Sequence, residues 1–529
     1  MWYKSAIGYQ IYPKSFKSID SSVGTIKGIT SKLDYLKDLG IDLIWICPIF
    51  DSPMDDNGYD IRDYYKINPD YGTMEDVKEM ITKAHKLGLK IIFDLVLNHT
   101  SIEHEWFKKS CAKDPYYDDF YIWSKEKYNW GSFFGGSAFS YNEERKEYFL
   151  HIFSDKMPDL NWKSINLKKE VKKIIKYYLA LGIDGFRLDA ISHLCKKKLE
   201  NTTPINKDLV YDYSLFSNLK EVHNILKEFK REIFSHYNIM TIGEIGGNPT
   251  IKQALDYCND ELDMVYTFGF TNCAKVDLHN MSSNKMDVKA MRNLISAYQN
   301  ELNEKGWMGL YLTNHDIERA MSLYGDMDYF IESGSMLAVL MYMLKGTPFI
   351  YNGEEIGMTN YPFKKVSDFD DVRIRTTYKL NTTLSEEEFV NAVKDTSRDN
   401  ARTIMQWDDS EYAGFSSSKP WFHINPNYKT INVKKEEQEE RSLLNEYKKI
   451  IKLRKSLTQI TQSYYEEIML DERIISYKRG NLLIICNCTN NVITLNNLPN
   501  VKRVLYNNYN NFHDYKVIEP YQAYVMEVE

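Results

Sequence analysis

Short apolar runs recur along the chain and alternate with longer amphipathic stretches. The runs have the length and composition of buried strands, whereas the stretches 73–88 and 167–182 show helical spacing of apolar residues and end in glycine. The apolar runs cover residues 6–13, 43–48, 90–97, 184–190, 239–245, 264–270, 309–313 and 347–352. Eight strands that alternate with helices predict an α/β fold, a parallel (β/α)₈ TIM barrel, rather than an open sheet.

Two long segments interrupt this alternation, and the end of the chain departs from it. Residues 101–163 follow the third strand and are too long and too rich in aromatic residues for a simple loop, so we expect a small inserted domain there. Residues 356–440 form a long, highly charged connection after the eighth strand. The barrel then comprises 1–100 and 164–455, and the short β runs of 456–529 predict a C-terminal antiparallel β-sandwich.

Composition narrows the class of protein. The 529 residues are 43% hydrophobic and carry a net charge of −7, and no long block of lysine or arginine appears, which argues against a nucleic-acid partner. Seven cysteines without a framework spacing indicate free thiols in a reducing compartment. No signal peptide and no apolar run of membrane-spanning length appear in the sequence. We therefore expect a cytoplasmic protein that has no membrane partner. The sequence does not determine the oligomeric state, and we expect a monomer.

Polar side chains cluster where the predicted strands end. They are Asp94, Asn98, His99, Arg187, Asp189, Glu244, Asn314, His315 and Asp316. In a parallel barrel the carboxyl ends of all strands meet at one face, where catalytic groups gather. A single aspartate in such a place more often caps a turn or forms an ion pair. Three carboxylates on separate strands, with two histidines and an arginine, favour a catalytic site.

Several blocks of sequence resemble the α-amylase family, glycoside hydrolase family 13. They are DLVLNHT (94–100), GFRLDAISH (185–193), GEIGG (243–247), LTNHD (312–316), MPDLNW (157–162) and GIDLIWICPIFDSPMDDNGYD (40–60). SRDNARTIMQW (397–407) resembles the motif of the α-glucosidase and oligo-1,6-glucosidase branch of that family. The ordered blocks extend over nearly the whole chain and imply a glycoside hydrolase.

The resemblance implies a role for each of three carboxylates. Asp189 matches the nucleophile, Glu244 the acid/base, and Asp316 the carboxylate that binds substrate hydroxyls and helps to distort the sugar. A retaining glycosidase needs two carboxyls roughly 5 Å apart, one to attack the anomeric carbon and one to protonate the leaving oxygen. Arg187 lies two positions before Asp189 on the same face of the strand. We expect it to keep Asp189 charged and oriented.

Further positions match residues that bind the sugar before the cleaved bond. His99 and His315 match hydrogen-bonding groups, and Tyr59 matches the ring that stacks under the sugar. Asp60 and Arg398 match the pair that closes the pocket around the terminal 4-hydroxyl. The resemblance thus implies an enzyme that acts from the non-reducing end.

Ala190, directly after the proposed nucleophile, bears on linkage specificity. In this branch, valine at this position tends to accompany a preference for α-1,6 bonds, and alanine or threonine accompanies acceptance of α-1,4 bonds. A small side chain leaves room for the leaving sugar of a 1,4-linked substrate. Met157, where many 1,6-acting members have glutamine, favours the same interpretation. The sequence therefore predicts an α-glucosidase that cleaves maltose.

Three alternatives stay open. The substrate could be isomaltose or dextran ends, as for an oligo-1,6-glucosidase, or trehalose 6-phosphate. A protein of a different class would be a sugar-binding relative without catalysis.

The metal-binding loop of the branch is replaced here by SIDSSVGT (18–25), in which Asp20 is the only carboxylate. Because hard cations need several oxygen ligands, we expect no structural metal and no cofactor.

Overall fold

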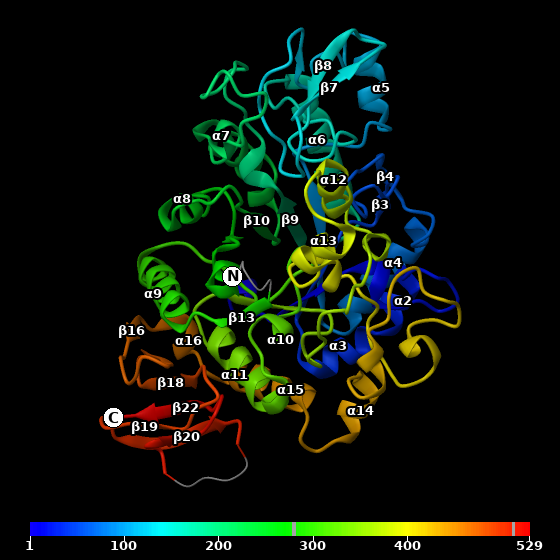
Figure 1. The fold of residues 1–529 in the computed structure, drawn as a ribbon. Helices are drawn as coiled ribbons and strands as arrows, with labels where there is room; N and C mark the ends of the chain where they lie inside the picture. Colours follow the sequence, from blue (N-terminus) through cyan, green and yellow to red (C-terminus); the bar gives the residue numbers. More distant parts are fainter. Residues whose placement is uncertain (278–281, 510–513) are drawn as a thin grey trace.

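Eight parallel strands form the centre of the computed structural model, which describes residues 1–277, 282–509 and 514–529 (Figure 1). The strands are β1 (Gly8–Ile11), β2 (Leu43–Ile46), β5 (Lys90–Val96), β9 (Gly185–Asp189), β10 (Met240–Glu244), β11 (Met264–Tyr266), β14 (Gly309–Leu310) and β15 (Thr347–Tyr351). Their order in the sheet is β11-β10-β9-β5-β2-β1-β15-β14. A parallel bridge between Val265 and Met308 joins the two outer strands. The sheet is therefore closed, which confirms the predicted TIM barrel, and each predicted apolar run contains one of its strands.

Helices surround this barrel and cover its outer face. Among them are α2 (Ile26–Ser31), α3 (Leu33–Leu39), α4 (Met74–Lys86), α6 (Ile165–Ala180), α7 (Lys220–Glu232), α8 (Ile251–Asp256), α9 (Val288–Glu304), α11 (Phe330–Tyr342) and α15 (Leu443–Ser456). The two amphipathic stretches of the sequence correspond to α4 and α6. A capping box between Thr73 and Asp76 starts α4. Helix α6 begins two residues earlier than predicted, because the Ser164 side chain accepts a hydrogen bond from the Leu167 amide.

A small sheet lies in the segment between β5 and α6. It consists of β6 (Trp123–Ser124), β8 (Glu147–Leu150) and β7 (Phe139–Asn142), in that order, and α5 (Glu105–Cys111) precedes it. Trp130, Phe139 and Leu150 form a separate apolar cluster with Phe216 from the connection after β9. In Figure 1 this lobe projects from the barrel beside α6 and α7. The inserted segment thus packs against the barrel through the loops at the carboxyl ends of the strands.

The connection after β15 and the C-terminal region complete the fold. The connection contains α12 (Val372–Leu380), α13 (Glu386–Val393), a 3₁₀ turn at Arg398–Asn400, and α14 (Val433–Gln438). The C-terminal antiparallel sheet has the order β16 (Tyr465–Glu467), β17 (Ile474–Arg479), β18 (Leu482–Asn487), β22 (Ala523–Val528) and β20 (Val501–Asn507). Strands β19 (Ile493–Thr494) and β21 (Val517–Ile518) pair separately and contribute Ile493 and Ile518 to the same core. Two sheets that share a core agree with the predicted sandwich.

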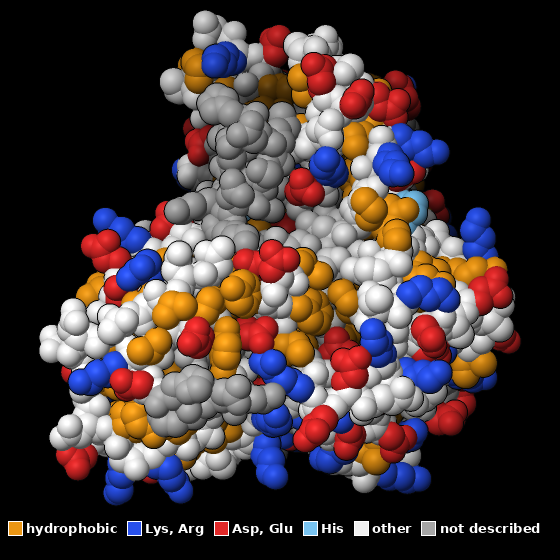
Figure 2. Space-filling model, turned by 60° about the horizontal axis from the view of Figure 1, so that its bottom comes forward, with side chains coloured by type: hydrophobic (Ala, Val, Ile, Leu, Met, Phe, Trp, Pro, Cys, Tyr) orange, Lys and Arg blue, Asp and Glu red, His pale blue; other side chains and the backbone are white. Residues whose placement is uncertain are grey.

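The surface carries charges of both signs. Acidic and basic side chains are interspersed over the face shown in Figure 2. Among the helices that the structure describes, none is long and apolar enough to cross a lipid bilayer.

A buried carboxyl group just after β15 gives a prediction about stability. Glu354 accepts hydrogen bonds from the hydroxyls of Tyr342 and Tyr447, and its second oxygen has no partner. Burial raises the pKa of Glu354 to about 8. The folded state therefore keeps this proton at a pH where the unfolded chain has lost it, and stability falls as pH rises from about 5 to about 8.

We expect Glu354→Gln to remove this dependence. Between about pH 5 and pH 8 the melting temperature of the wild type should fall more steeply than that of the variant. The free energy of unfolding of the wild type should fall faster than that of the variant by up to about 1.4 kcal/mol per pH unit. Glu387→Gln, at an exposed position in α13, is the matched control and should follow the wild type. Parallel curves for the wild type and Glu354→Gln would contradict the prediction.

Candidate active site

A cavity of about 510 Å³ opens at the carboxyl ends of the barrel strands. The predicted residues among its lining are Tyr59, His99, Asp189, Ala190, Glu244, Asp316 and Arg398. The other lining residues are Asp56, Phe133, Phe134, Phe153, Met157, His193, Tyr213, Gly246, Gly247, Asn248, Phe268 and Arg373. Three predicted residues do not line it, Asp60, Arg187 and His315. The structure thus brings the three carboxylates of separate strands to one pocket.

Arg187 lies fully buried behind the pocket and connects its carboxylates. Its Nη1 atom is 2.6 Å from Oδ1 of Asp189 and 2.6 Å from Oδ1 of Asp94, and its Nη2 atom contacts Oε2 of Glu244. The Tyr266 hydroxyl accepts a hydrogen bond from Nε at 3.0 Å. One guanidinium therefore fixes the two carboxyls that the sequence predicts as nucleophile and acid/base on the same side of the cavity.

The Asp189 and Glu244 carboxyls also influence each other's protonation. Burial raises the pKa of Asp189, and the neighbouring Glu244 adds to that rise while Arg187 opposes it. Burial likewise raises the pKa of Glu244, again against the effect of Arg187. Because like charges this close ionise in two steps, the pair retains a proton at a higher pH than isolated carboxyls do. The pocket can therefore supply one acid and one carboxylate together.

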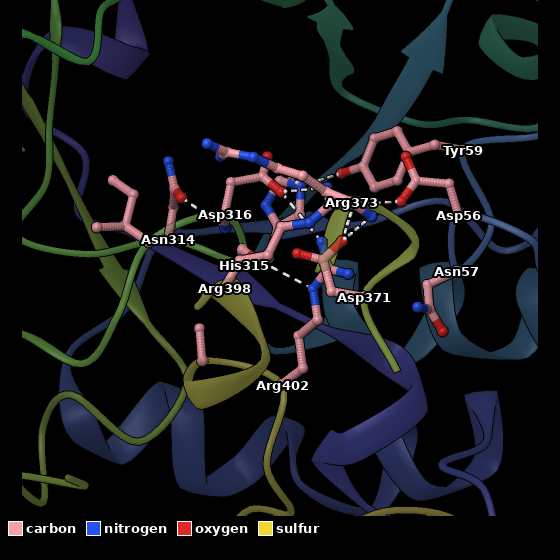
Figure 3. A network of polar contacts seen from close by, with 12 residues as sticks. Asp56, Asn57, Tyr59, Asn314, His315, Asp316, Asp371, Arg373, Arg398 and Arg402 are labelled. Atoms are coloured by element: carbon pink, nitrogen blue, oxygen red, sulfur yellow. Dashed lines mark hydrogen bonds and ion pairs between the residues drawn. The ribbon is translucent and has the colours of Figure 1, made fainter. Parts of the chain in front are cut away.

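The groups around Asp316 shift its pKa in the opposite direction from the pKa values of Asp189 and Glu244 (Figure 3). Its Oδ1 atom lies 3.1 Å from Arg398 and 3.1 Å from Arg402, and its Oδ2 atom lies 3.1 Å from Nε2 of His315. Burial opposes ionisation, but His315 and the two arginines outweigh it and hold the pKa of Asp316 well below its usual range. Asp316 is therefore ionised at neutral pH, as expected for a carboxylate that accepts hydrogen bonds from sugar hydroxyls.

Tyr59 and His99 line the cavity, and His315 stacks on Tyr59 outside the lining. Tyr59 stacks on His315 at 5.2 Å with an interplanar angle of 5°, and its hydroxyl is 2.7 Å from Nε2 of that ring. Burial lowers the pKa of His99 to about 3, so this ring is neutral. Its Nε2 atom is buried and has no hydrogen-bond partner. An unpaired ring nitrogen in a residue of the pocket lining could bind a sugar hydroxyl, and the binding role of His99 stays a prediction.

Of the two residues predicted to close the pocket around the terminal sugar, Arg398 lines the cavity and Asp60 does not. Asp60 is fully buried and accepts hydrogen bonds from the Ser52 hydroxyl and from the amides of Asp55 and Asp56. From the same segment of the chain, Asp56 contacts Arg398, with its Oδ1 2.7 Å from Nη2. Positive φ angles at positions 57 and 58 reverse the chain between the two aspartates, so Asp56 faces the pocket and Asp60 faces the turn.

Other polar residues of the site were not predicted. Asp371, the N-cap of α12, lies 2.8 Å from Nη2 of Arg398. Arg402, fully buried, also donates from Nε to the His315 carbonyl at 3.1 Å. His193 lines the cavity, and its Nδ1 lies 3.1 Å from the Phe216 carbonyl. Asp56, His193 and Arg402 lie within the motifs that resemble the family. Residue type alone did not show that these three side chains belong to the site.

A buried ammonium group joins the inserted segment to the pocket loops. Nζ of Lys196 lies 2.7 Å from Oδ2 of Asp159, 2.7 Å from Oδ1 of Asn98 and 2.6 Å from the carbonyl oxygen of His193. The Lys196 side chain is 3% exposed and that of Asp159 is 0% exposed. This cation therefore connects the loop after β5, the loop after β9 and the MPDLNW segment around the pocket.

The described residues give no candidate for a resident metal. They contain no cluster of three or more His, Cys, Asp or Glu side chains that could hold an ion. In the loop 18–25, the Ser18 hydroxyl accepts a hydrogen bond from the Ser21 amide, and the Ser418 hydroxyl donates to the Asp20 carbonyl. That this protein needs neither a metal nor a cofactor stays a prediction.

Comparisons with known proteins agree over most of the chain. The family model described as "Alpha amylase, catalytic domain" matches residues 10–463. An oligo-1,6-glucosidase of Parageobacillus thermoglucosidasius is 44% identical over 513 residues, which cover 92% of this chain and 90% of that protein. An α-glucosidase of Pediococcus pentosaceus is 40% identical, covering 91% and 89% of the two chains. The crystal structure of Bacillus licheniformis trehalose-6-phosphate hydrolase has a TM-score of 0.92 at 38% identity and covers 100% of this chain and 99% of that one.

Proposed function

Because this chain is a glycoside hydrolase of the α-amylase family, we propose that it is a retaining α-glucosidase that releases glucose from the non-reducing end of maltose and short α-1,4-linked oligosaccharides. The observation that carries the proposal is the set of contacts around Arg187, which fixes Asp189 and Glu244 on one side of the pocket. In the proposed reaction Asp189 is the nucleophile and Glu244 is the acid/base.

In the first step Glu244 donates its proton to the glycosidic oxygen while the Asp189 carboxylate attacks the anomeric carbon. The glycosidic bond breaks, the leaving sugar departs with the proton, and glucose stays bound to Asp189 as an ester. In the second step Glu244 takes a proton from water, whose oxygen attacks the same carbon and releases glucose. Two displacements at one carbon retain its configuration.

The far end of the pocket supports action on chain ends. Arg398 contacts Asp56, Asp316 and Asp371 at 2.7, 3.1 and 2.8 Å, and the Phe134 ring lies 5.2 Å from its guanidinium carbon. We infer that these groups bind one terminal sugar and block the path of a longer chain beyond it. Maltose and short oligosaccharides should therefore yield glucose, whereas starch should be cut poorly.

Cleavage of α-1,6 bonds is the second candidate, because several relatives are named oligo-1,6-glucosidases. Ala190 favours the α-1,4 alternative. Its side chain lines the cavity directly after Asp189, at a φ of 46°. Two further methyl groups at this position would project beside the nucleophile, where the leaving sugar of a 1,4-linked substrate approaches.

We expect Ala190→Val to shift the ratio of kcat/KM for isomaltose to maltose toward isomaltose, by about 1–3 kcal/mol in transition-state free energy. Valine at a positive φ is strained, but this strain affects both substrates and cancels in the ratio. Ala190→Gly, which tolerates the backbone conformation and keeps the space, should leave the ratio unchanged. An unchanged ratio in Ala190→Val would refute the steric explanation.

A single assay tests the proposed substrate. The purified wild type is incubated with maltose, isomaltose, trehalose 6-phosphate and sucrose in parallel, and released glucose is measured. Maltose should react fastest. Faster release from isomaltose would identify an oligo-1,6-glucosidase and reject the α-1,4 assignment.

A further inference from the structure

Arg373 differs from the other charged residues that line the pocket. It occupies the first turn of α12, where its backbone amide donates to Oδ1 of Asp371 at 2.9 Å. Its side chain is exposed at the surface and lines the cavity. Within residues 1–277, 282–509 and 514–529, its guanidinium makes no hydrogen bond and no ion pair, in contrast to Arg398, which contacts three carboxylates.

The groups that suit the terminal sugar lie elsewhere in the pocket. Under the proposed function, Tyr59, His99, Asp316 and the pair of Asp56 and Arg398 bind that sugar. In Figure 3 the Arg373 side chain extends away from Asp56 and Tyr59, on the side of Asp316. The remaining lining consists mainly of aromatic and small residues, among them Phe153, Asn248 and Phe268. Arg373 is thus a charged hydrogen-bond donor in the pocket lining. Neither the catalytic carboxyls nor the binding of the terminal sugar gives it a role.

We infer that Arg373 binds hydroxyl groups of the leaving sugar, in the subsite on the far side of the cleaved bond from the terminal glucose. This inference rests on the proposed function, because it assumes the same pocket and the same reaction. A guanidinium offers five N–H donors and is weakly hydrated, so it exchanges water for sugar hydroxyls readily.

A neutral leaving sugar fits this site better than a phosphorylated one. A phosphate dianion is bound in proteins by several cationic groups or by a row of backbone amides. Arg373 and Arg398 are the cationic residues of the lining, and Arg398 is already bound to three carboxylates. A single free arginine beside four carboxylates, Asp56, Asp189, Glu244 and Asp316, is a poor phosphate site but a sufficient hydroxyl donor.

The test compares two leaving groups in one variant. Arg373→Gln should lower kcat/KM for maltose about tenfold, mainly through a higher KM. Hydrolysis of p-nitrophenyl α-glucoside, whose leaving group has no sugar hydroxyls, should change less than about twofold. Arg375→Gln is the matched control, since Arg375 lies on the same helix, is half-buried, contacts Asp370 and does not line the cavity. It should leave both substrates unaffected.

Three results would overturn the inference. Equal losses on both substrates in Arg373→Gln would show a general structural effect, which the melting temperature would also register. Unchanged kcat/KM for maltose would show that Arg373 does not contact the leaving sugar. Cleavage of trehalose 6-phosphate faster than maltose by the wild type, lost in Arg373→Gln, would assign the residue to a phosphate. A wild type inactive on the aryl glucoside would instead reject the proposed function itself.

Discussion

Replacing Asp189 with asparagine is expected to lower the rate of α-glucoside hydrolysis at least about 10³-fold. Asparagine keeps the size of the side chain but cannot form the ester with the anomeric carbon. Arg187 would lose one anionic partner, yet Asp94 and Glu244 still contact it. We therefore expect the variant to fold. Hydrolysis of p-nitrophenyl α-glucoside, followed by the absorbance of the released nitrophenol, measures the loss.

The control for this variant separates chemistry from folding. Asp189→Asn should keep a melting temperature within a few degrees of the wild type and should still bind maltose. A rate close to that of the wild type would mean that Asp189 is not the nucleophile. A folded variant with the expected loss supports the assignment of the reaction to the carboxylates at the ends of β9 and β10.

Replacing Lys196 with methionine should destabilise the protein by about 3–5 kcal/mol. Methionine has a similar length but no charge, so Asp159 would lie buried without its cation. The Lys196 side chain is 3% exposed, which leaves little solvent to replace the lost contact. Chemical denaturation measures the change in unfolding free energy. Activity should fall as well, because Asn98 and the His193 carbonyl also contact this ammonium group.

Two companion variants identify the cause of that loss. Lys197→Met is the control, because Lys197 is exposed and its Nζ lies 3.3 Å from the Ser214 hydroxyl. It should leave the free energy of unfolding almost unchanged. Adding Asp159→Asn to Lys196→Met removes the unpaired charge and should restore part of the stability. Equal stability of Lys196→Met and Lys197→Met would show that the buried ion pair does not hold these loops together.

The barrel could be predicted because its strands are buried on both faces and therefore appear as short continuous apolar runs. The positions of Asp189, Glu244 and Asp316 followed from the same pattern, since each lies at or just after the end of such a run. The structure places all three in one cavity. Their catalytic roles remain part of the proposed function.

The partner of Arg398 could not be predicted in the same way. Asp55, Asp56 and Asp60 lie within one short turn, and residue type does not distinguish them. Which carboxylate faces the pocket depends on the backbone between them, where Asn57 has a φ of 51°. Asp371 and Lys196 were missed because each contributes through a contact with residues far away in the sequence. Such contacts exist only once the loops have packed together.

The configuration of the first product tests the central claim most directly. Proton nuclear magnetic resonance can follow p-nitrophenyl α-glucoside during the first minutes of hydrolysis, before mutarotation mixes the anomers. A retaining mechanism through Asp189 and Glu244 predicts that α-glucose appears first and β-glucose follows slowly. Initial release of β-glucose would contradict the account, because a single displacement by water would then replace the ester on Asp189.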